Sequence, residues 1–289
     1  MDNEVIGSNG HDAQVVTAPA VSKKRPSNVW LIVVAALFII VPFLTWYFTW
    51  FGRALSDEKV AEYLVDEKHP RNVQHALAQV EERIERKDAS VKKFYPQVVT
   101  ASKSSTAEVR KTAAWVMGQD NTSDEFHRAL VDLLKDSEPL VRRNAALQLV
   151  SFGDGSGRPE FRAMLEPFEA KSPLAGTVVS LLTPGTHIQT GGLLARIRVA
   201  SGSAEEFRAP VSGSVASVLV KENDAVANGQ TVASIVPDRA TVLAALRALA
   251  YIGTKDDLAA VEGSKRMDPS TETVQQAVTT EKAIQTRGK

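Results

Sequence analysis

The strongest constraint on this chain is a pattern that occurs twice between Ser172 and Ile235. A proline, two glycines and nearly every apolar position coincide in the two copies once a one-residue gap is allowed. The copies begin Ser172-Pro173-Leu174-Ala175-Gly176-Thr177-Val178 and Ala209-Pro210-Val211-Ser212-Gly213-Ser214-Val215. A duplication of this size predicts two equivalent hairpin units that bury their apolar faces only by packing against each other.

Short β-branched runs separated by turn residues predict strands in both copies. Pro184-Gly185 marks a turn in the first copy, and Asn223 takes the place of Gly185 in the second. Asn is the residue other than Gly that most readily adopts a left-handed turn. Gly176 and Gly213 would let strands approach closely. We therefore expect a flattened barrel of two small interlocked sheets.

The segments on either side of this doubled stretch predict paired helices with a period near 32 residues. Val109-Arg110-Lys111-Thr112-Ala113-Ala114-Trp115 aligns with Val141-Arg142-Arg143-Asn144-Ala145-Ala146-Leu147. Ser123 is expected to cap a helix over 124–135, and Gly153 to end the following one. Further helices are expected over 239–252, 255–262 and 271–287. The doubled stretch thus interrupts, or is clasped by, one array of helix pairs.

The N-terminal region contains a long uncharged segment. No charge occurs from Pro26 to Gly52, and Val29–Leu44 is apolar throughout. A membrane span needs about 20 such residues. We expect a transmembrane helix over 28–52, with lipid contact through Val29–Trp50 and interfacial tryptophans near both ends. A cleaved signal peptide is the alternative.

Basic residues set the expected orientation of this segment. Lys23-Lys24-Arg25 precede it, whereas Arg53 follows and is opposed by Asp57 and Glu58. The positive-inside tendency predicts a cytoplasmic N-terminus in the inner (plasma) membrane. The bulk of the chain is then expected to be periplasmic or otherwise extracytoplasmic.

These observations predict an α+β multidomain chain with one transmembrane helix and a helical solenoid interrupted by a small all-β module. The expected parts are a disordered cytoplasmic tail (1–27), the transmembrane helix (28–52), helical repeats (54–168), the β module (169–237) and C-terminal helices that continue the array (238–287).

Composition excludes several classes of function. The chain has 34 basic and 34 acidic residues, so it offers nucleic acid no electrostatic footprint. It has no cysteine, which excludes disulfides and thiolate metal sites, and its five histidines are scattered. Its adjacent acidic pairs face apart on a helix or a strand. We therefore expect no enzyme activity, no metal site and no cofactor.

Four basic residues are the candidates for contact with a partner. Arg110, Lys111, Arg142 and Arg143 occupy matching places in the two aligned helices. They are expected to line one edge of the array and to meet an acidic surface of another protein. The alternative is that they form ordinary solvated faces of the repeats.

The aligned helices resemble HEAT-type repeats, whose second helix tends to read Val-Arg-x-x-Ala-Ala-x-x-Leu. Residues 141–149 follow this pattern throughout, and residues 109–114 follow its first part. The resemblance implies an α-solenoid with an extended surface for protein binding. An irregular helical bundle is the alternative.

The doubled stretch resembles the biotinyl/lipoyl-attachment (barrel-sandwich hybrid) family through Ser172-Pro173-x-x-Gly176-Thr177-Val178 and Ala209-Pro210-x-x-Gly213-Ser214-Val215. Carrier members of that family have a lysine at the hairpin tip that joins the halves. Here the joining residues 198–206 contain no lysine, so a biotin or lipoyl carrier is disfavoured. Export adaptors with this fold carry a long helical hairpin between the halves, whereas about ten residues join them here.

The sequence therefore predicts a non-catalytic, membrane-anchored scaffold subunit of an envelope complex that binds protein partners. The alternative is an accessory or adaptor-like subunit of a transport or secretion system. A biotin or lipoyl carrier is the second alternative.

Overall fold

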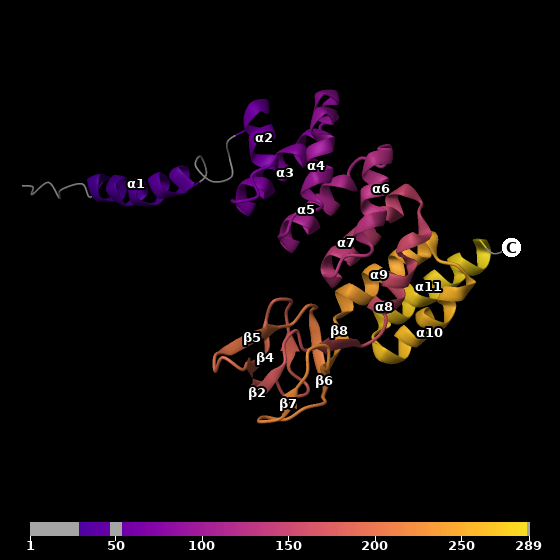
Figure 1. The fold of residues 1–289 in the computed structure, drawn as a ribbon. Helices are drawn as coiled ribbons and strands as arrows, with labels where there is room; N and C mark the ends of the chain where they lie inside the picture. Colours follow the sequence, from indigo (N-terminus) through magenta and orange to yellow (C-terminus); the bar gives the residue numbers. More distant parts are fainter. Residues whose placement is uncertain (1–28, 47–53, 288–289) are drawn as a thin grey trace, which may run out of the picture. The chain divides into compact units, whose positions relative to one another are not determined.

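The computed structural model describes residues 29–46 and 54–287 of the 289-residue chain (Figure 1). The chain divides into two compact units, Met1–Arg53 and Ala54–Lys289. The expected tail at 1–27 lies outside the described residues.

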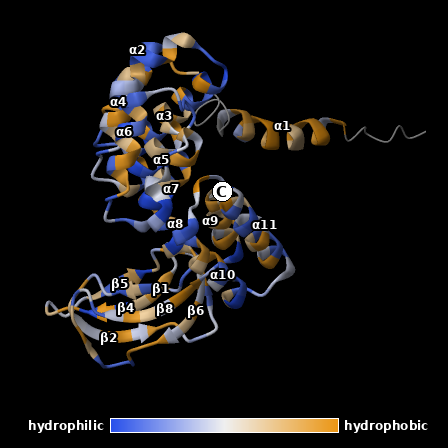
Figure 2. Cartoon of the chain, turned by 90° about the vertical axis from the view of Figure 1, so that its right-hand side faces the viewer, coloured by the Kyte–Doolittle hydropathy of each residue, from blue (hydrophilic) through white to orange (hydrophobic). Residues whose placement is uncertain are grey.

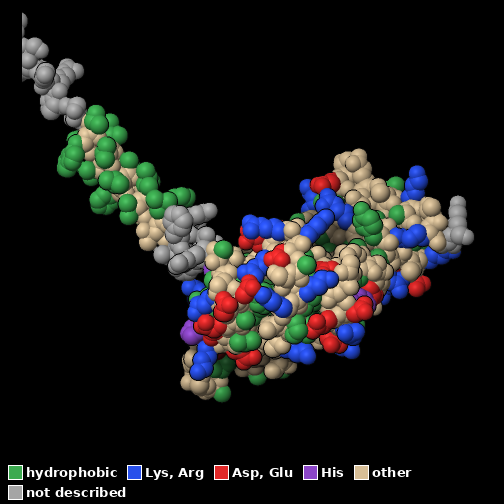
Figure 3. Space-filling model, turned by 90° about the horizontal axis from the view of Figure 1, so that it is seen from above, with side chains coloured by type: hydrophobic (Ala, Val, Ile, Leu, Met, Phe, Trp, Pro, Cys, Tyr) green, Lys and Arg blue, Asp and Glu red, His purple; other side chains and the backbone are tan. Residues whose placement is uncertain are grey.

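The described part of the first unit is a single apolar helix, α1 (Val29–Trp46). It contains Pro42, and most of its described side chains are exposed and hydrophobic (Figures 2 and 3). Eighteen residues span about 27 Å, short of the roughly 30 Å hydrocarbon core. Within residues 29–46 and 54–287 no helix is long and apolar enough to cross a membrane. The expected spanning helix over 28–52 is therefore not supported, and residues 47–52 lie outside the described part.

The second unit contains helices that follow one another in pairs. The described pairs are α2 (Asp57–Leu64) with α3 (Pro70–Glu85), α4 (Tyr95–Ala101) with α5 (Ala107–Met117), α6 (Asp124–Leu133) with α7 (Pro139–Leu149), α8 (Arg158–Met164) with α9 (Arg239–Ile252), and α10 (Leu258–Met267) with α11 (Thr271–Arg287). The second helices α5 and α7 start 32 residues apart, and α9 and α11 repeat that spacing. The array therefore has the predicted period on both sides of the strands.

Local signals place the ends of these helices where the sequence predicts them. The Ser123 hydroxyl accepts the Phe126 amide and caps α6, and Pro139 occupies the first turn of α7. Gly153 has φ of 70°, the predicted left-handed residue after the 3-10 turn Val150–Phe152. Helix α6 ends at Leu133, two residues earlier than expected. Helices α9 and α11 have the predicted bounds.

Two apolar cores support the array. The first runs through α2–α7 and is formed around side chains such as Leu77, Met117 and Phe126. The second combines Phe161 of α8 with Leu246 and Leu249 of α9 and with residues of α10 and α11. Helices from before and after the strands therefore share one core.

The doubled stretch and the few residues that flank it form two four-stranded antiparallel sheets, which agrees with the two small sheets that the sequence predicts. The strands are β1 (Phe168–Lys171), β2 (Gly176–Leu181), β3 (His187–Ile188), β4 (Leu193–Arg198), β5 (Ala204–Arg208), β6 (Gly213–Val218), β7 (Ala225–Val226) and β8 (Thr231–Pro237). Their orders are β1-β8-β6-β3 and β5-β4-β2-β7. Each copy gives its short strand, β3 or β7, to the sheet of the other copy. This exchange is the physical reason that neither half can bury its face alone.

Glycines hold equivalent places in the two copies. A Cβ added to Gly176 would lie 2.4 Å from the Arg198 carbonyl oxygen, and one added to Gly213 would lie 2.1 Å from that of Val236. Both glycines are therefore required by close backbone approach. Gly185 and Asn223 both have positive φ, at 86° and 71°, so the predicted left-handed turn occurs twice.

The strands occur between the two helices of one pair, because β1–β8 separate α8 from α9 in the chain. Arg143 of α7 contacts the β module at the point where the inserted strands begin. Its guanidinium carbon lies 5.9 Å from the centre of the Phe168 ring, at the start of β1. The β module is thus attached to the helix array by a cation–π contact as well as by its two connections.

Candidate functional site

Arg110 of α5 binds both its own helix pair and the next one. Its Nε and Nη2 donate to the two carboxylate oxygens of Asp136, at 2.6 and 2.8 Å. Its Nη1 donates to the carbonyl oxygens of Ser104 and Ser105, in the turn that precedes α5. The Arg110 guanidinium lowers the pKa of Asp136 below its usual range. This side chain therefore fastens one repeat to its successor.

Arg142 makes the equivalent contacts in the following pair. Its Nη1 donates to the carbonyl oxygens of Asp136 and Ser137, at 2.8 and 3.1 Å. Its Nε donates to Glu160 of α8 at 3.1 Å. We call Arg110 with Asp136 and Arg142 with Glu160 the arginine ladder. Two of the three predicted partner-binding arginines are thus engaged in contacts within the chain.

The other two predicted residues have different environments. Arg143 is buried, with only 8% of its side chain exposed, and pairs with Glu160 at 3.4 Å. Burial lowers the pKa of Arg143, and the Glu160 carboxylate opposes this shift. The expectation that Arg143 lies on a solvent-facing edge is therefore wrong, because α8 and β1 cover it. Lys111 is partly exposed and forms an ion pair with Glu108 one turn earlier.

A second set of contacts joins the first helix of one pair to the start of the next. The Tyr95 hydroxyl donates to Asp120 at 2.7 Å, and His127 lies 2.7 Å from Asp154. Burial, and then the contact with Asp120, raises the pKa of Tyr95. The set ends at Asp257, a fully buried carboxylate 2.5 Å from Arg162 Nη1. These groups stabilise the array rather than forming a reactive centre.

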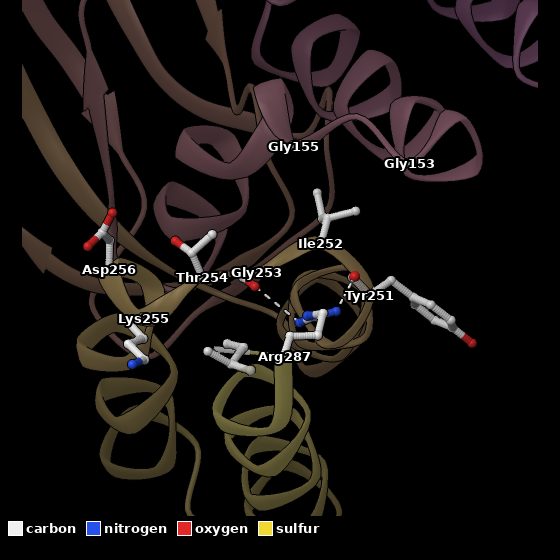
Figure 4. Close-up of a pocket in the computed structure, with 10 residues that line it drawn as sticks. Gly153, Gly155, Tyr251, Ile252, Gly253, Thr254, Lys255, Asp256 and Arg287 are labelled. Carbon is white, nitrogen blue, oxygen red and sulfur yellow. Dashed lines mark hydrogen bonds between the residues drawn. The ribbon is translucent and has the colours of Figure 1, made fainter. Parts of the chain in front are cut away.

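An open cleft of about 590 Å³ lies where the fourth and fifth pairs meet. Its lining comes from the turn after α7, the end of α9 with the turn that follows it, and the end of α11. The lining residues are Gly153, Gly155, Tyr251, Ile252, Gly253, Thr254, Lys255, Asp256, Ile284 and Arg287. Figure 4 shows the Arg287 guanidinium near its centre, with the Tyr251 ring pointing away.

The chemistry of this cleft is limited by what Arg287 already binds. Its Nη1 and Nη2 donate to carbonyl oxygens at the end of α9, those of Leu249, Ala250, Tyr251 and Gly253. A guanidinium in this place neutralises the C-terminal end of the helix dipole. Among the described lining residues, Lys255 and Asp256 are the remaining charged groups, and they are adjacent in sequence. No cluster of metal-ligating side chains occurs in the described part of the chain.

Trp115 and Glu81 form a contact that the sequence analysis did not single out. Trp115 is 46% exposed on α5, and its indole Nε1 donates to Glu81 Oε1 of α3 at 2.5 Å. In the repeat alignment Trp115 occupies the same position as Leu147. Other residues of α5 form the buried face of that helix. A large aromatic residue at a solvent-facing helix position was the feature of the sequence that could have indicated this contact.

A family model for HEAT repeats matches residues 95–170, the region that contains α4 to α8. No curated protein matches the chain. Among solved structures, the chain is similar to one described as a single-chain, multi-domain long-chain acyl-CoA carboxylase, at 22% identity and a TM-score of 0.24. That match covers 26% of this chain and 8% of the other. A likeness of this size carries no argument about function, whereas the HEAT match agrees with the helix pairs observed here.

Proposed function

We propose that this chain is a non-catalytic scaffold that binds a protein partner on its second helices. Helices α3, α5 and α7 contact one another in turn, and α9 contacts α11. Large hydrophobic side chains remain exposed on three of them: Trp115 on α5, Tyr251 on α9 and Val278 on α11. Packed helix rows of this kind offer extended binding surfaces. These exposed apolar side chains on packed second helices are the observation that carries the proposal.

The β module is proposed to be of the biotinyl/lipoyl type without the attachment function. Two observations support this: the exchanged short strands of the doubled stretch, and the tight hairpin between β4 and β5. In that hairpin the Val199 amide donates to the Ser203 carbonyl, and Gly202 has φ of 91°. No lysine occurs there to accept a cofactor. The module then serves as a rigid attachment to the array rather than as a carrier.

Attachment to the inner membrane is the remaining part of the proposal. The apolar, solvent-exposed side chains of α1 support lipid contact, and the sequence after Trp46 stays uncharged to Gly52. A scaffold held at a membrane has a raised effective concentration near other membrane proteins. Extraction of native membranes with alkaline carbonate tests this part. Release of the protein into the supernatant would contradict membrane attachment but would not bear on the scaffold function.

The scaffold function is tested by mild detergent purification of the tagged full-length protein from its native source, followed by mass spectrometry of co-purifying proteins. The expected result is a stoichiometric partner that is lost in the variant Trp115→Ser/Tyr251→Ser. Lys221→Ser, on an exposed turn of the β module, is the surface control. A monomer without partners under several detergent conditions would overturn the proposal.

An adaptor-like subunit of a transport or secretion system is the second candidate. The short β4–β5 connection leaves no room for a long helical arm, which weighs against it. Mass photometry of the purified protein distinguishes the two candidates, because ring assembly favours the adaptor and a defined hetero-complex with a partner favours the scaffold.

A further inference from the structure

Trp115 is a large aromatic side chain kept at the surface of α5. Around it on the same helix Val109, Ala113, Ala114, Val116 and Met117 are buried, so the core does not require this indole. Its ring is held by the hydrogen bond to Glu81, which joins α5 to α3. An exposed tryptophan with a fixed edge presents a π-face for binding.

The carboxylates of Glu81, at the indole edge, and of Glu85 are not used in ion pairs within the described residues. Four cations on or next to α3 and α5 are already paired, in Arg83–Asp57, Arg86–Glu82, Arg110–Asp136 and Lys111–Glu108. Glu81 and Glu85 form no ion pair in the described residues. They are four residues apart on α3 and therefore share one face of that helix. Glu81 thus lies at the indole edge, and Glu85 lies one turn further along the same face of α3, each without an ion pair in the described residues.

We propose that Trp115, Glu81 and Glu85 form a site for an arginine side chain from a basic segment of the partner protein. The inference rests on the proposed scaffold function and specifies the chemistry of its partner. A planar guanidinium can stack on the indole face while its N–H groups donate to a carboxylate at the ring edge. A lysine ammonium lacks the planar stacking surface and the fork of donors. The site therefore favours arginine over lysine, and basic over acidic or purely apolar segments.

Trp115 can report directly on its own site. The chain has four tryptophans, so a full-length variant with Trp30→Phe, Trp46→Phe and Trp50→Phe retains Trp115 as the single indole. In detergent, its emission is followed during titration with a short acetylated peptide of alternating arginine and glycine. The same peptide with citrulline in place of arginine is the control, because citrulline keeps the shape and removes the charge. A saturable change with the arginine peptide alone is expected.

Variants separate this site from a general effect of charge. In Glu81→Gln/Glu85→Gln the arginine peptide should bind at least about tenfold more weakly, whereas Glu169→Gln on the exposed face of β1 should leave binding unchanged. Replacing arginine by lysine in the peptide should also weaken binding. Equal binding of the citrulline peptide, or unchanged binding by the double variant, would overturn the proposal.

The two proposals fail in different ways. If a native partner co-purifies equally well with wild type and with Glu81→Gln/Glu85→Gln, the scaffold function stands and this arginine site is wrong. If no partner co-purifies at all while the arginine peptide still binds through Glu81 and Glu85, the site stands and the scaffold function is wrong.

Discussion

Arg110 and Arg142 make the same two-sided contact 32 residues apart. Each guanidinium donates from Nη1 to two carbonyl oxygens in the turn before its own helix, and from Nε to a carboxylate of the neighbouring segment. The accepting carbonyl groups lie in the turns between helices, outside the helical hydrogen-bond pattern, and these arginines bond to them while joining adjacent repeats. The repeat in the sequence is therefore matched by a repeat of contacts.

Removal of the first contact should destabilise the array. We expect Arg110→Ala to lower the free energy of unfolding by about 2 kcal/mol, because the pair with Asp136 is charge-assisted and largely shielded from solvent. Lys111→Ala is the matched control and should cost less than about 0.5 kcal/mol, since its pair with Glu108 is a surface one. Urea unfolding of the full-length protein in detergent, followed by circular dichroism, measures both. Equal losses of unfolding free energy in the two variants would contradict a stabilising role of the arginine ladder beyond that of a surface ion pair.

The same pair predicts a specific dependence of stability on acid. The pKa of Asp136 is lowered in the folded protein, chiefly by Arg110. The ionised Asp136 carboxylate therefore contributes its full stabilisation above its pKa in the unfolded chain, which is about 4. That stabilisation is lost as the pH falls through its lower pKa in the folded protein. The difference in stability between wild type and Asp136→Asn should shrink as the pH falls from 6 to 3. A difference that does not shrink between pH 6 and pH 3 would contradict this contribution of the pair.

Arg143 should behave as a core residue rather than as part of a binding edge. Arg143→Ala is expected to cost about 3 kcal/mol, since it leaves a cavity and removes a buried ion pair beside Phe168. Arg143→Met should cost less, because the apolar stem is retained and Glu160 keeps its contact with Arg142. Thermal melts of both variants compare these costs. A neutral effect of Arg143→Ala would show that the burial is unimportant for stability.

The two equivalent glycines of the β module should be equally intolerant of a side chain. Gly176→Ala and Gly213→Ala should each destabilise by about 2–3 kcal/mol or more, because the added methyl group meets a backbone carbonyl. Gly263→Ala is the control within α10, where an added Cβ would lie 4.0 Å from Nη2 of Arg266, a flexible side chain of the same helix. It should stabilise by up to about 1 kcal/mol through helix propensity. Destabilisation by the control would indicate a hidden steric contact.

The regular parts of the fold were predictable because each repeats. The positions of Gly176 and Gly213, and of Gly185 and Asn223, defined two equivalent halves, and the helix pairs had a fixed period. Capping residues such as Ser123 and Gly153 then placed the helix ends. Local steric and hydrogen-bonding rules decide these features, so a single sequence contains the necessary information.

The candidate site was harder to predict, because adjacent residues on a helix point in different directions. Arg142 and Arg143 are neighbours of the same type, yet the former is partly exposed and the latter is buried against β1. That difference depends on where the inserted strands return to the array, which no local pattern contains. The link between Trp115 and Glu81 likewise joins residues 34 apart in the chain through the packing of α3 against α5.

The position of the β module between α8 and α9 also affects how the protein is made. During synthesis α8 leaves the ribosome about 70 residues before its partner α9, so the second core must wait for the whole module. Closing an unfolded loop of that length costs roughly 2–3 kcal/mol more than closing a short turn. A module that has already folded brings its two ends together in advance and removes most of this cost. The strands thus set an order of folding, in which α8 packs against α9 only after the β module has formed.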